Sequence, residues 1–444
     1  MSGEQGAMID RSQHYAVIGA GPAGLSAARN LQRFGVLFDG FEAHSDVGGL
    51  WDINNPRSTV YESAHLISSK RMTEFAEFPM PPETPDYPDH AMLARYFRDF
   101  ARYFGLYEHY RLDAAVERVW PEDDAACHWL LRLASGETFR YRGVLIANGT
   151  LAEPNRPGFR GQFSGRLMHS SEYKSARIFD DRRVLIVGAG NSGCDIAVDA
   201  VHRAKSVDIS LRRGYHFVPK YMLGKPADQL GGGLPLPRPL KQRLDRFLLR
   251  LFTGNPEHFG FPRPDHALYE SHPIVNSLVL YHAGHGDLGV RGDIHEFDGD
   301  TVRFVDGSAA EYDLVLLATG YKLHYPFIDR AHLNWQGASP GLYLNVFHPG
   351  YDNLFVLGMV EATGLGWQGR HEQAEMVARF LAAREHETDA ADWLRRRKAG
   401  GNPDLSGGYR YLKLDRMAYY VHKDTYLREV RRVNRALASK SSPG

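Results

Sequence analysis

Residues 15–42 read YAVIGAGPAGLSAARNLQRFGVLFDGFE, and this stretch decides the fold. The apolar run at 15–18 predicts a strand, the Ala and Leu spacing over 25–34 predicts a helix packed on a sheet, and a second strand follows at 36–41. Between strand and helix lies the turn GAGPAG at 19–24. Its glycines let the backbone approach a pyrophosphate, and the helix N-terminus supplies free amides. We therefore predict a nucleotide-binding strand, turn and helix.

Glu42 ends the second of these strands, eighteen residues beyond Gly24. An acid at this distance binds the ribose hydroxyls of an adenosine, and its charge repels a 2'-phosphate. The first turn should therefore accept FAD or NAD and reject NADP. The positions that we expect to contact FAD here are Gly19, Gly21, Pro22, Ala23, Gly24 and Glu42.

The same layout returns in the middle of the chain. A strand pattern at 183–187 is followed by GAGNSG at 188–193, a helical pattern at 194–204 and a strand pattern at 207–211. We predict a second nucleotide-binding turn, with contacts from Gly188, Gly190, Asn191, Ser192 and Gly193.

The second copy ends differently, since Arg212 and Arg213 stand where the first copy has Glu42. A guanidinium can bind a 2'-phosphate through two parallel hydrogen bonds, so this copy should bind NADPH. The alternative for the two arginines is an exposed, solvated place at a strand end.

Two further matches to the glycine pattern differ in context. GHGDLG at 284–289 leads into strand and turn patterns, and we predict a loop there. GLGWQG at 364–369 follows a strand pattern at 354–357 and precedes a helical pattern at 372–383. It either directs helix amides at an anionic flavin ring or only packs.

Composition excludes several function classes. Lys plus Arg and Asp plus Glu both total 53, so net charge would not draw the chain to nucleic acid or a membrane. The two cysteines, Cys127 and Cys194, form no CxxC pair, and the 21 histidines show no metal-binding spacing. With no signal sequence and no long apolar run, we expect a cytoplasmic protein without a metal, a nucleic-acid partner or a membrane.

Two stretches rich in proline or glycine each precede an expected helix. The five prolines of 78–88 predict a stiff surface excursion, and the aromatic stripe of the next helix, 93–104, reads as core. The Gly- and Pro-rich segment 224–240 precedes an apolar-faced helix at 241–251. It is either a lid or partner surface, or an ordinary loop and core helix.

With these motifs in place, the sequence resembles the flavin-containing monooxygenases, the class B flavoprotein family, over most of its length. The family pattern FxGxxxHxxx(Y/F) is matched by FSGRLMHSSEY, with Phe163, Gly165, His169 and Tyr173. Tyr173 stands where the Baeyer-Villiger relatives carry Trp. Further matches are GGLW at 48–51, LATGY at 317–321 and SSKRMTEFAEFPMP from Ser68.

This resemblance implies a specific chemistry. NADPH reduces FAD, and the reduced flavin reacts with O2 to give a C4a-hydroperoxide, which oxygenates a small molecule at a soft nitrogen or sulfur. The family commonly has Asn where this chain has Ile67, so a release of hydrogen peroxide is the first alternative, with Ser68 and Ser69 as possible substitutes. A Baeyer-Villiger oxygenation of a carbonyl compound is the second.

The resemblance also implies an α/β fold of two Rossmann-like dinucleotide-binding domains, the NADPH domain being inserted into the FAD domain. We expect the FAD domain at 1–165 and, with C-terminal helices, at 316–444, and the NADPH domain at 166–315. The sequence leaves an oligomer possible. The added FAD contacts are Gly49, Leu50, Trp51, Val116, Asn148 and Gln373, and the added NADPH contacts are Tyr173, Ala318, Thr319 and Gly320.

Overall fold

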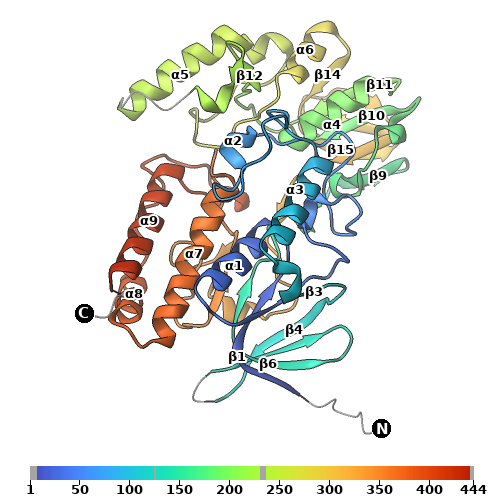
Figure 1. Cartoon of the computed structure of the whole chain (residues 1–444). Helices are drawn as coiled ribbons and strands as arrows, with labels where there is room; N and C mark the ends of the chain where they lie inside the picture. Colours follow the sequence, from blue (N-terminus) through green and yellow to red (C-terminus); the bar gives the residue numbers. More distant parts are fainter. Residues whose placement is uncertain (1–7, 125–126, 231–236, 441–444) are drawn as a thin grey trace, which may run out of the picture.

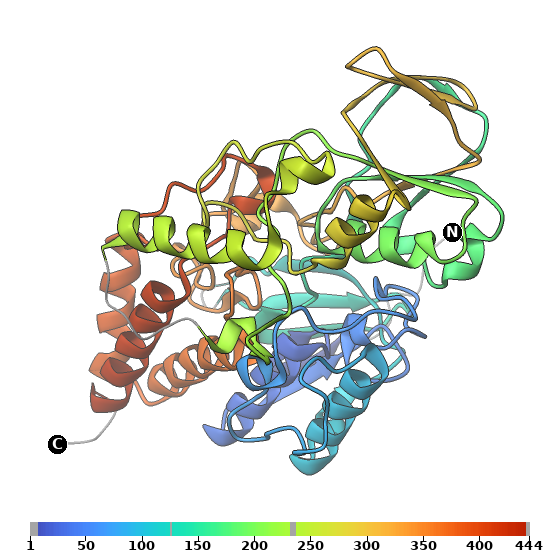
Figure 2. The same cartoon turned by 90° about the horizontal axis from the view of Figure 1, so that it is seen from above.

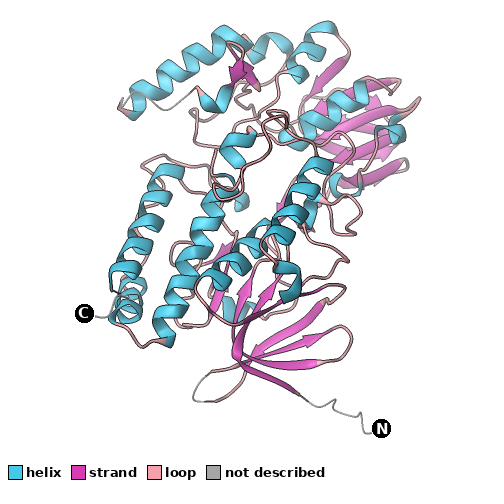
Figure 3. Cartoon of the chain, in the orientation of Figure 1, coloured by secondary structure: helices cyan, strands magenta, loops and turns pink. Residues whose placement is uncertain are grey.

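The computed structural model describes residues 8–124, 127–230 and 237–440. It has a mixed α/β fold in which the strands gather in separate sheets with helices around them (Figure 3). In Figure 1, β1 and β6 mark the first sheet and β10 and β11 the second.

The first sheet is built on a parallel centre. Its strand β1 pairs in parallel with β2 on one side and with β6 on the other, because the apolar run at its end is buried from both faces. The sheet order is β3-β2-β1-β6-β5-β4, and β22 also pairs with β6. The strands are β1 (Ile9–Ile18), β2 (Phe38–Phe41), β3 (Tyr110–Arg111), β4 (Val116–Pro121), β5 (Trp129–Leu133), β6 (Thr138–Ile146) and β22 (Leu354–Val356).

Helices from both ends of the chain cover this sheet. The helix α1 (Pro22–Arg33) packs against α7 (Gly366–Glu385), and α7 in turn packs against α8 (Asp389–Ala399) and α9 (Lys423–Lys440). Figure 1 shows α7 and α9 side by side, in orange and red. The predicted aromatic stripe lies on α3 (His90–Tyr103), where it is buried in the same core, as expected.

The second sheet is wholly parallel, with order β14-β11-β10-β18-β9. The helix α4 (Asn191–Val201) connects β10 to β11, and α6 (Leu278–His285) precedes β14. In sequence this sheet lies between β6 and β22 of the first sheet. Its strands are β9 (Arg166–His169), β10 (Arg183–Val187), β11 (Ser206–Ser210), β14 (Leu288–Arg291) and β18 (Leu314–Leu317).

Smaller elements complete the described chain. A four-stranded sheet is made of β8 (Arg160–Phe163), β15 (Ile294–Gly299), β16 (Thr301–Phe304) and β17 (Ala309–Glu311). Short pairs are β7 (Glu153–Pro154) with β19 (Tyr321–Lys322), β12 (Tyr221–Met222) with β13 (Lys225–Pro226), and β20 (Trp335–Gln336) with β21 (Ser339–Pro340). The remaining helices are α2 (Lys70–Thr73) and α5 (Arg238–Thr253).

Two predicted boundaries differ from the structure. The prediction that GHGDLG is a loop is wrong in part, because it spans the end of α6 and the start of β14, with Gly286 in the left-handed conformation that ends a helix. The helix predicted at 372–383 begins at Gly366, inside the glycine-rich motif. In the described part of the chain, no helix combines the length and the apolar character needed to cross a membrane.

Candidate functional site

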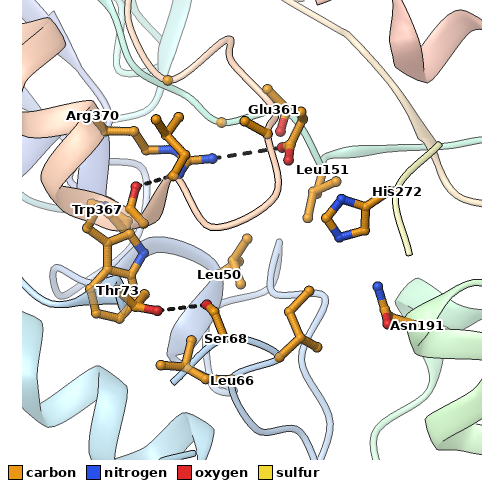
Figure 4. Close-up of a pocket in the computed structure, with 18 of the residues that line it drawn as sticks. Leu50, Leu66, Ser68, Thr73, Leu151, Asn191, His272, Glu361, Trp367 and Arg370 are labelled. Atoms are coloured by element: carbon orange, nitrogen blue, oxygen red, sulfur yellow. Dashed lines mark hydrogen bonds and ion pairs between the residues drawn. The ribbon is translucent and has the colours of Figure 1, made fainter. Parts of the chain in front are cut away.

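A cavity of about 1700 Å³ runs between the two glycine-rich turns. Its walls come from the first turn, the loop at 49–51, the segment at 64–68, the N-terminus of α4 and the segment that leads into α7. Figure 4 shows apolar side chains such as Leu50 and Leu66 on one side and the polar groups of Glu361, His272 and Asn191 on the other. Of the predicted positions, Gly19, Gly21, Pro22, Ala23, Glu42, Gly49, Leu50, Trp51, Ile67, Ser68, Val116, Asn148, Asn191 and Ser192 line it.

The first turn is shaped by contacts that exclude side chains. Gly19 has φ of +106°, and a Cβ there would lie 2.6 Å from the carbonyl oxygen of Ala147. A Cβ on Gly24 would lie 1.8 Å from the Gly19 oxygen. The helix α1 starts after Gly21 with no side-chain cap, so its first amides remain free for an anion.

Glu42 is held rigidly at the end of β2. Its carboxylate accepts hydrogen bonds from the amide of Ala20 at 2.6 Å and from the amide of His44 at 3.0 Å. The side chain is buried yet borders the cavity, which places a fixed negative charge beside the first turn.

Asn148 carries an unsatisfied polar atom next to this turn. Its amide nitrogen donates to the carbonyl of His324 at 3.1 Å, whereas its buried Oδ1 has no hydrogen-bond partner among the described residues. A buried acceptor left open is costly unless a ligand supplies the donor. Asn148 is therefore oriented to receive a ligand hydrogen bond.

The second turn repeats the geometry of the first. Gly188 has φ of +105°, and a Cβ there would lie 2.6 Å from the oxygen of Ala318. A Cβ on Gly193 would lie 1.9 Å from the Gly188 oxygen. The helix α4 starts after Gly190, again without a side-chain cap. Both turns thus present a strand, a bare backbone and the free amides of a helix N-terminus.

The two arginines after β11 differ in their surroundings. Arg212 is exposed and makes no hydrogen bond or ion pair with any residue that the structure describes. Arg213 is half-buried, and its guanidinium lies 3.9 Å from the Asp265 carboxylate. Arg212 is therefore the freer of the two to bind an anion.

The family model described as flavin-binding monooxygenase-like matches residues 12–387. The chain belongs to this family.

Relatives and solved structures agree with this membership. The chain is 34% identical over 322 residues to the indole-3-pyruvate monooxygenase YUCCA1 of Oryza sativa subsp. japonica, covering 70% of this chain and 77% of that protein. It is 30% identical to flavin-containing monooxygenase 5 of Oryctolagus cuniculus over 79% and 69% of the two chains. The open crystal structure of cyclohexanone monooxygenase shares the fold, with a TM-score of 0.72, 19% identity and coverage of 97% and 98%. The protein is a flavin-dependent monooxygenase, and its cofactors are FAD and NADPH.

The segment at 67–69 of this monooxygenase has a defined hydrogen-bond pattern. Ile67 borders the cavity with an apolar side chain, and Ser68 Oγ lies 2.7 Å from Thr73 Oγ1 (Figure 4). Ser69 is fully buried: its amide donates to Asp228 at 2.7 Å, and its hydroxyl accepts from Gln229 at 3.0 Å. Ser69 therefore does not reach the cavity, contrary to its place among the expected flavin-edge positions.

The residues of FSGRLMHSSEY span β9 and the turn after it, and Ser171 and Glu172 of this motif line the cavity. The ring of His169 contacts the carbonyl of Gly320 at 3.1 Å, and burial lowers the pKa of this histidine. Thr319 donates to the carbonyl of Asn155 at 2.5 Å. Tyr173 is buried and donates to Asp199 at 2.8 Å, and burial raises its pKa. The structure does not bring Tyr173 into the cavity.

Gln373 also lies outside the cavity. Its side chain is fully buried, accepts a hydrogen bond from the amide of Gly358 at 2.8 Å and donates to Tyr426 at 2.7 Å. Gly358 borders the cavity, so Gln373 fixes a wall residue from behind. The predicted positions Gly24, Gly188, Gly190, Gly193, Arg212, Arg213, Ala318, Thr319 and Gly320 likewise lie outside it.

The start of α7 faces the cavity, which favours the first of the two readings of GLGWQG. Residues 364–367 line the cavity, and α7 begins without a side-chain cap. Trp367 packs edge-on against Trp51 at 6.2 Å between ring centres. The motif also packs closely, since a Cβ on Gly366 would lie 2.3 Å from the carbonyl oxygen of Met72.

The sequence reasoning missed a polar group at the other side of the cavity. Arg370 lies 3.8 Å from Glu361, whose pKa is raised by burial (Figure 4). The Nδ1 of His272 lies 3.2 Å from the Tyr420 hydroxyl, and burial lowers the pKa of His272 to about 4. These residues come from segments that are distant in the sequence. Only Arg370 lies next to a motif that the sequence indicated, GLGWQG at 364–369.

One group of possible metal ligands is not part of the cavity lining. The ligand atoms of Glu122, Asp124 and His128 lie within 4.8 Å of one another. Arg140 already binds them, with Nε 2.5 Å from Glu122 and Nη2 2.8 Å from Asp124 and 3.1 Å from His128. The guanidinium supplies the positive charge that these acids require, so we propose no metal site at these residues.

Proposed function

We propose that this monooxygenase transfers one oxygen atom of O2 to a soft nitrogen or sulfur of a small molecule. The observation that supports this most is the shared cavity, because a continuous space joins the first turn, the segment at 67–68 and the start of α4. Reducing nucleotide, flavin and substrate would then meet in one cavity.

The residues of the first turn fit FAD. Gly19, Gly21 and Gly49 have no side chains that would occupy the space of a pyrophosphate. The buried Oδ1 of Asn148 has no hydrogen-bond donor among the described residues, so FAD can supply one. Glu42 matches ribose hydroxyls and opposes a 2'-phosphate. FAD bound there supplies the activation of oxygen once NADPH has reduced it.

The second turn suits NADPH in the same way. Its free α4 amides match a pyrophosphate, and Arg212 has no competing partner among the described residues. We accordingly propose Rossmann-like FAD and NADPH domains, with FAD bound by 1–165 and 316–444 and NADPH by 166–315.

The chain's own residues would position the substrate and exclude water. Leu50, Leu66 and Trp367 form an apolar wall, and the indole of Trp367 is fixed by Trp51. Opposite this wall, His272 is neutral near pH 7 because its pKa is lowered to about 4, so it accepts or donates a hydrogen bond without a charge. The cavity therefore suits a largely apolar molecule with a polar end.

Release of hydrogen peroxide is the second candidate, and Ile67 favours it. This side chain borders the cavity where the family commonly has Asn, and it offers no hydrogen bond to an activated oxygen. Baeyer-Villiger oxygenation has no comparable support, because the likeness to cyclohexanone monooxygenase at 19% identity concerns the fold alone.

Turnover measurements test the proposal. The holoenzyme is supplied with NADPH and a thioether, a tertiary amine or a cyclic ketone, and NADPH, product and hydrogen peroxide are quantified together. Sulfoxide or N-oxide formation supports the proposal. If all NADPH electrons are recovered as hydrogen peroxide with every compound, the protein is an NADPH oxidase and the proposal is wrong. If only the lactone is formed, the protein is a Baeyer-Villiger oxygenase and the proposal is also wrong.

A further inference from the structure

The helix α5 exposes a continuous apolar stripe. Leu240, Phe247 and Leu251 are 52%, 60% and 66% exposed, and Leu244 and Leu248 lie between them on the same face. Isolated exposed apolar residues are ordinary on a protein surface, but a stripe along a whole helix marks a binding surface. In Figure 1 this helix lies at the top, and in Figure 2 no described segment passes over it.

Basic residues border this stripe. Arg243, Arg246 and Arg250 are all exposed and follow one another at helical spacing along its edge. The whole helix carries Arg238 and Lys241 as well, against one acid, Asp245, which pairs with Lys241 at 2.7 Å. The outer surface of α5 therefore combines apolar and cationic groups without exposed acids.

The inner face of α5 packs on the rest of the protein, and one edge of the helix borders the cavity. Leu249 is buried, and Gln242 donates to the carbonyl of Leu268 at 2.8 Å. Leu244 and Leu248, at the edge of the stripe nearest the cavity, line the cavity and are less exposed than the other three residues. The helix α5 is thus fixed with Leu240, Phe247 and Leu251 outward and with one edge of the stripe at the cavity.

We propose that the outer face of α5 binds the surface of an anionic lipid bilayer. A helix with a leucine and phenylalanine stripe beside arginines lies in the plane of a membrane interface, with the apolar side chains among the acyl chains and the guanidiniums at the phosphates. Anionic headgroups attract such a basic face. The same charges disfavour a partner with a basic surface, and a purely apolar partner would leave the arginines without counter-charges.

Vesicle binding tests the proposal without reference to turnover. The holoenzyme is sedimented with vesicles of phosphatidylglycerol and phosphatidylcholine and with vesicles of phosphatidylcholine alone. We expect binding to the mixed vesicles that weakens about tenfold in phosphatidylcholine alone and also weakens as salt is raised. Absence of binding to the mixed vesicles, or equal binding to both, would overturn the proposal.

Variants locate the binding face. Phe247→Glu/Leu251→Glu removes the centre of the stripe, and Arg243→Gln/Arg246→Gln/Arg250→Gln removes its charged border; each should lower binding about tenfold. Val305→Glu is the matched control, because Val305 is 66% exposed outside α5. Unchanged flavin absorbance shows that each variant is folded.

A second copy of the chain is the rival occupant. Sedimentation velocity without lipid distinguishes it: a dimer that Phe247→Glu/Leu251→Glu converts to monomer would show that the stripe is an interface between copies and overturn the lipid proposal. A wild-type monomer that binds the mixed vesicles supports it. Vesicle binding that survives both sets of α5 substitutions would place any lipid site elsewhere and also overturn it.

Discussion

Ser68 donates its hydroxyl hydrogen to Thr73, 2.7 Å away, because the Thr73 hydroxyl already donates its own hydrogen to the carbonyl of Ser69 at 2.9 Å. Ser68 Oγ therefore faces the cavity as an acceptor only. With Ile67 beside it, this edge of the cavity offers no side-chain donor to an activated oxygen from either residue.

Replacing Ile67 by Asn should raise the coupling of oxygen activation to product. The amide would supply the missing donor at the position where the family commonly has it. The measurement is the ratio of hydrogen peroxide released to NADPH consumed, which we expect to fall several-fold. Ile67→Leu is the control, and an unchanged ratio in Ile67→Asn would show that this position does not limit coupling.

Replacing Thr73 by Val should free the Ser68 hydroxyl. Without the Thr73 acceptor, Ser68 can turn its hydrogen toward the cavity, so the peroxide ratio should also fall. The double variant Thr73→Val/Ser68→Ala should return the ratio to that of the wild type, because the freed donor is gone. Equal ratios in Thr73→Val and the double variant would show that the Ser68 hydroxyl supplies no donor to the cavity.

Arg212→Ala should weaken NADPH binding by about 1.5 to 3 kcal/mol, the usual worth of a hydrogen bond to a charged group, and leave NADH nearly unchanged. Competition by NADP and NAD against anaerobic flavin reduction measures both affinities. Arg213→Ala should have the smaller effect, since Arg213 lies near Asp265. Equal losses for the two nucleotides would place the 2'-phosphate elsewhere.

Alanine at the last glycine of each turn should separate the two cofactors. Gly24→Ala places a Cβ against the Gly19 oxygen and should yield protein without bound flavin. Gly193→Ala makes the same clash with Gly188 and should leave flavin bound but raise the NADPH concentration needed for its reduction. Flavin absorbance and anaerobic reduction measure the two effects. Flavin loss in both variants to the same degree would argue against separate sites.

His348 should make stability depend on acid pH. Its Nδ1 accepts from the amides of Gly350 and Tyr351 at 3.0 and 2.8 Å, and burial beside Lys398 lowers its pKa to about 4. The unfolded state binds the proton at a higher pH than the folded state does. The contribution of neutral His348 to the free energy of unfolding is therefore fully present above the unfolded pKa of about 6.5, and about 3 kcal/mol of it is lost as the pH falls toward 4.

Urea unfolding at about pH 7 and about pH 4.5 measures this loss. His348→Asn is the informative variant, because the Oδ1 of the new amide keeps an acceptor for the two backbone amides and does not titrate. We expect the free energy of unfolding to depend less on pH in His348→Asn than in the wild type. An identical dependence in the two proteins would exclude His348 as its source.

Local patterns predicted the parts of the site that depend on local geometry. Both glycine-rich turns and the strands and helices around them lie where the sequence indicated, because strand, glycine turn and helix are consecutive in the chain. For Ile67 the expectation came from the family resemblance, and this residue lines the cavity. The positions of Tyr173 and Gln373 behind the wall depend on partners such as Asp199 and Tyr426, which no local pattern indicates.

The remaining differences have a similar cause. The polar wall of Glu361 and His272 forms only when distant segments meet. The helix at 241–251 was correctly predicted as amphipathic, but periodicity does not tell whether an apolar face is covered. The net charge of zero predicts no membrane partner, and an average over the chain carries no information about a local cluster such as the basic face of α5.

The interleaving of the two sheets has a consequence for synthesis on the ribosome. The second sheet needs only residues 166–317, whereas the first sheet waits for β22 at 354–356 and for the cover of α7. Since chains fold in units as they emerge, the inserted sheet is complete while the earlier strands still lack a partner and a layer of helix. Nascent chains halted between these points would hold a folded second sheet beside an exposed first one.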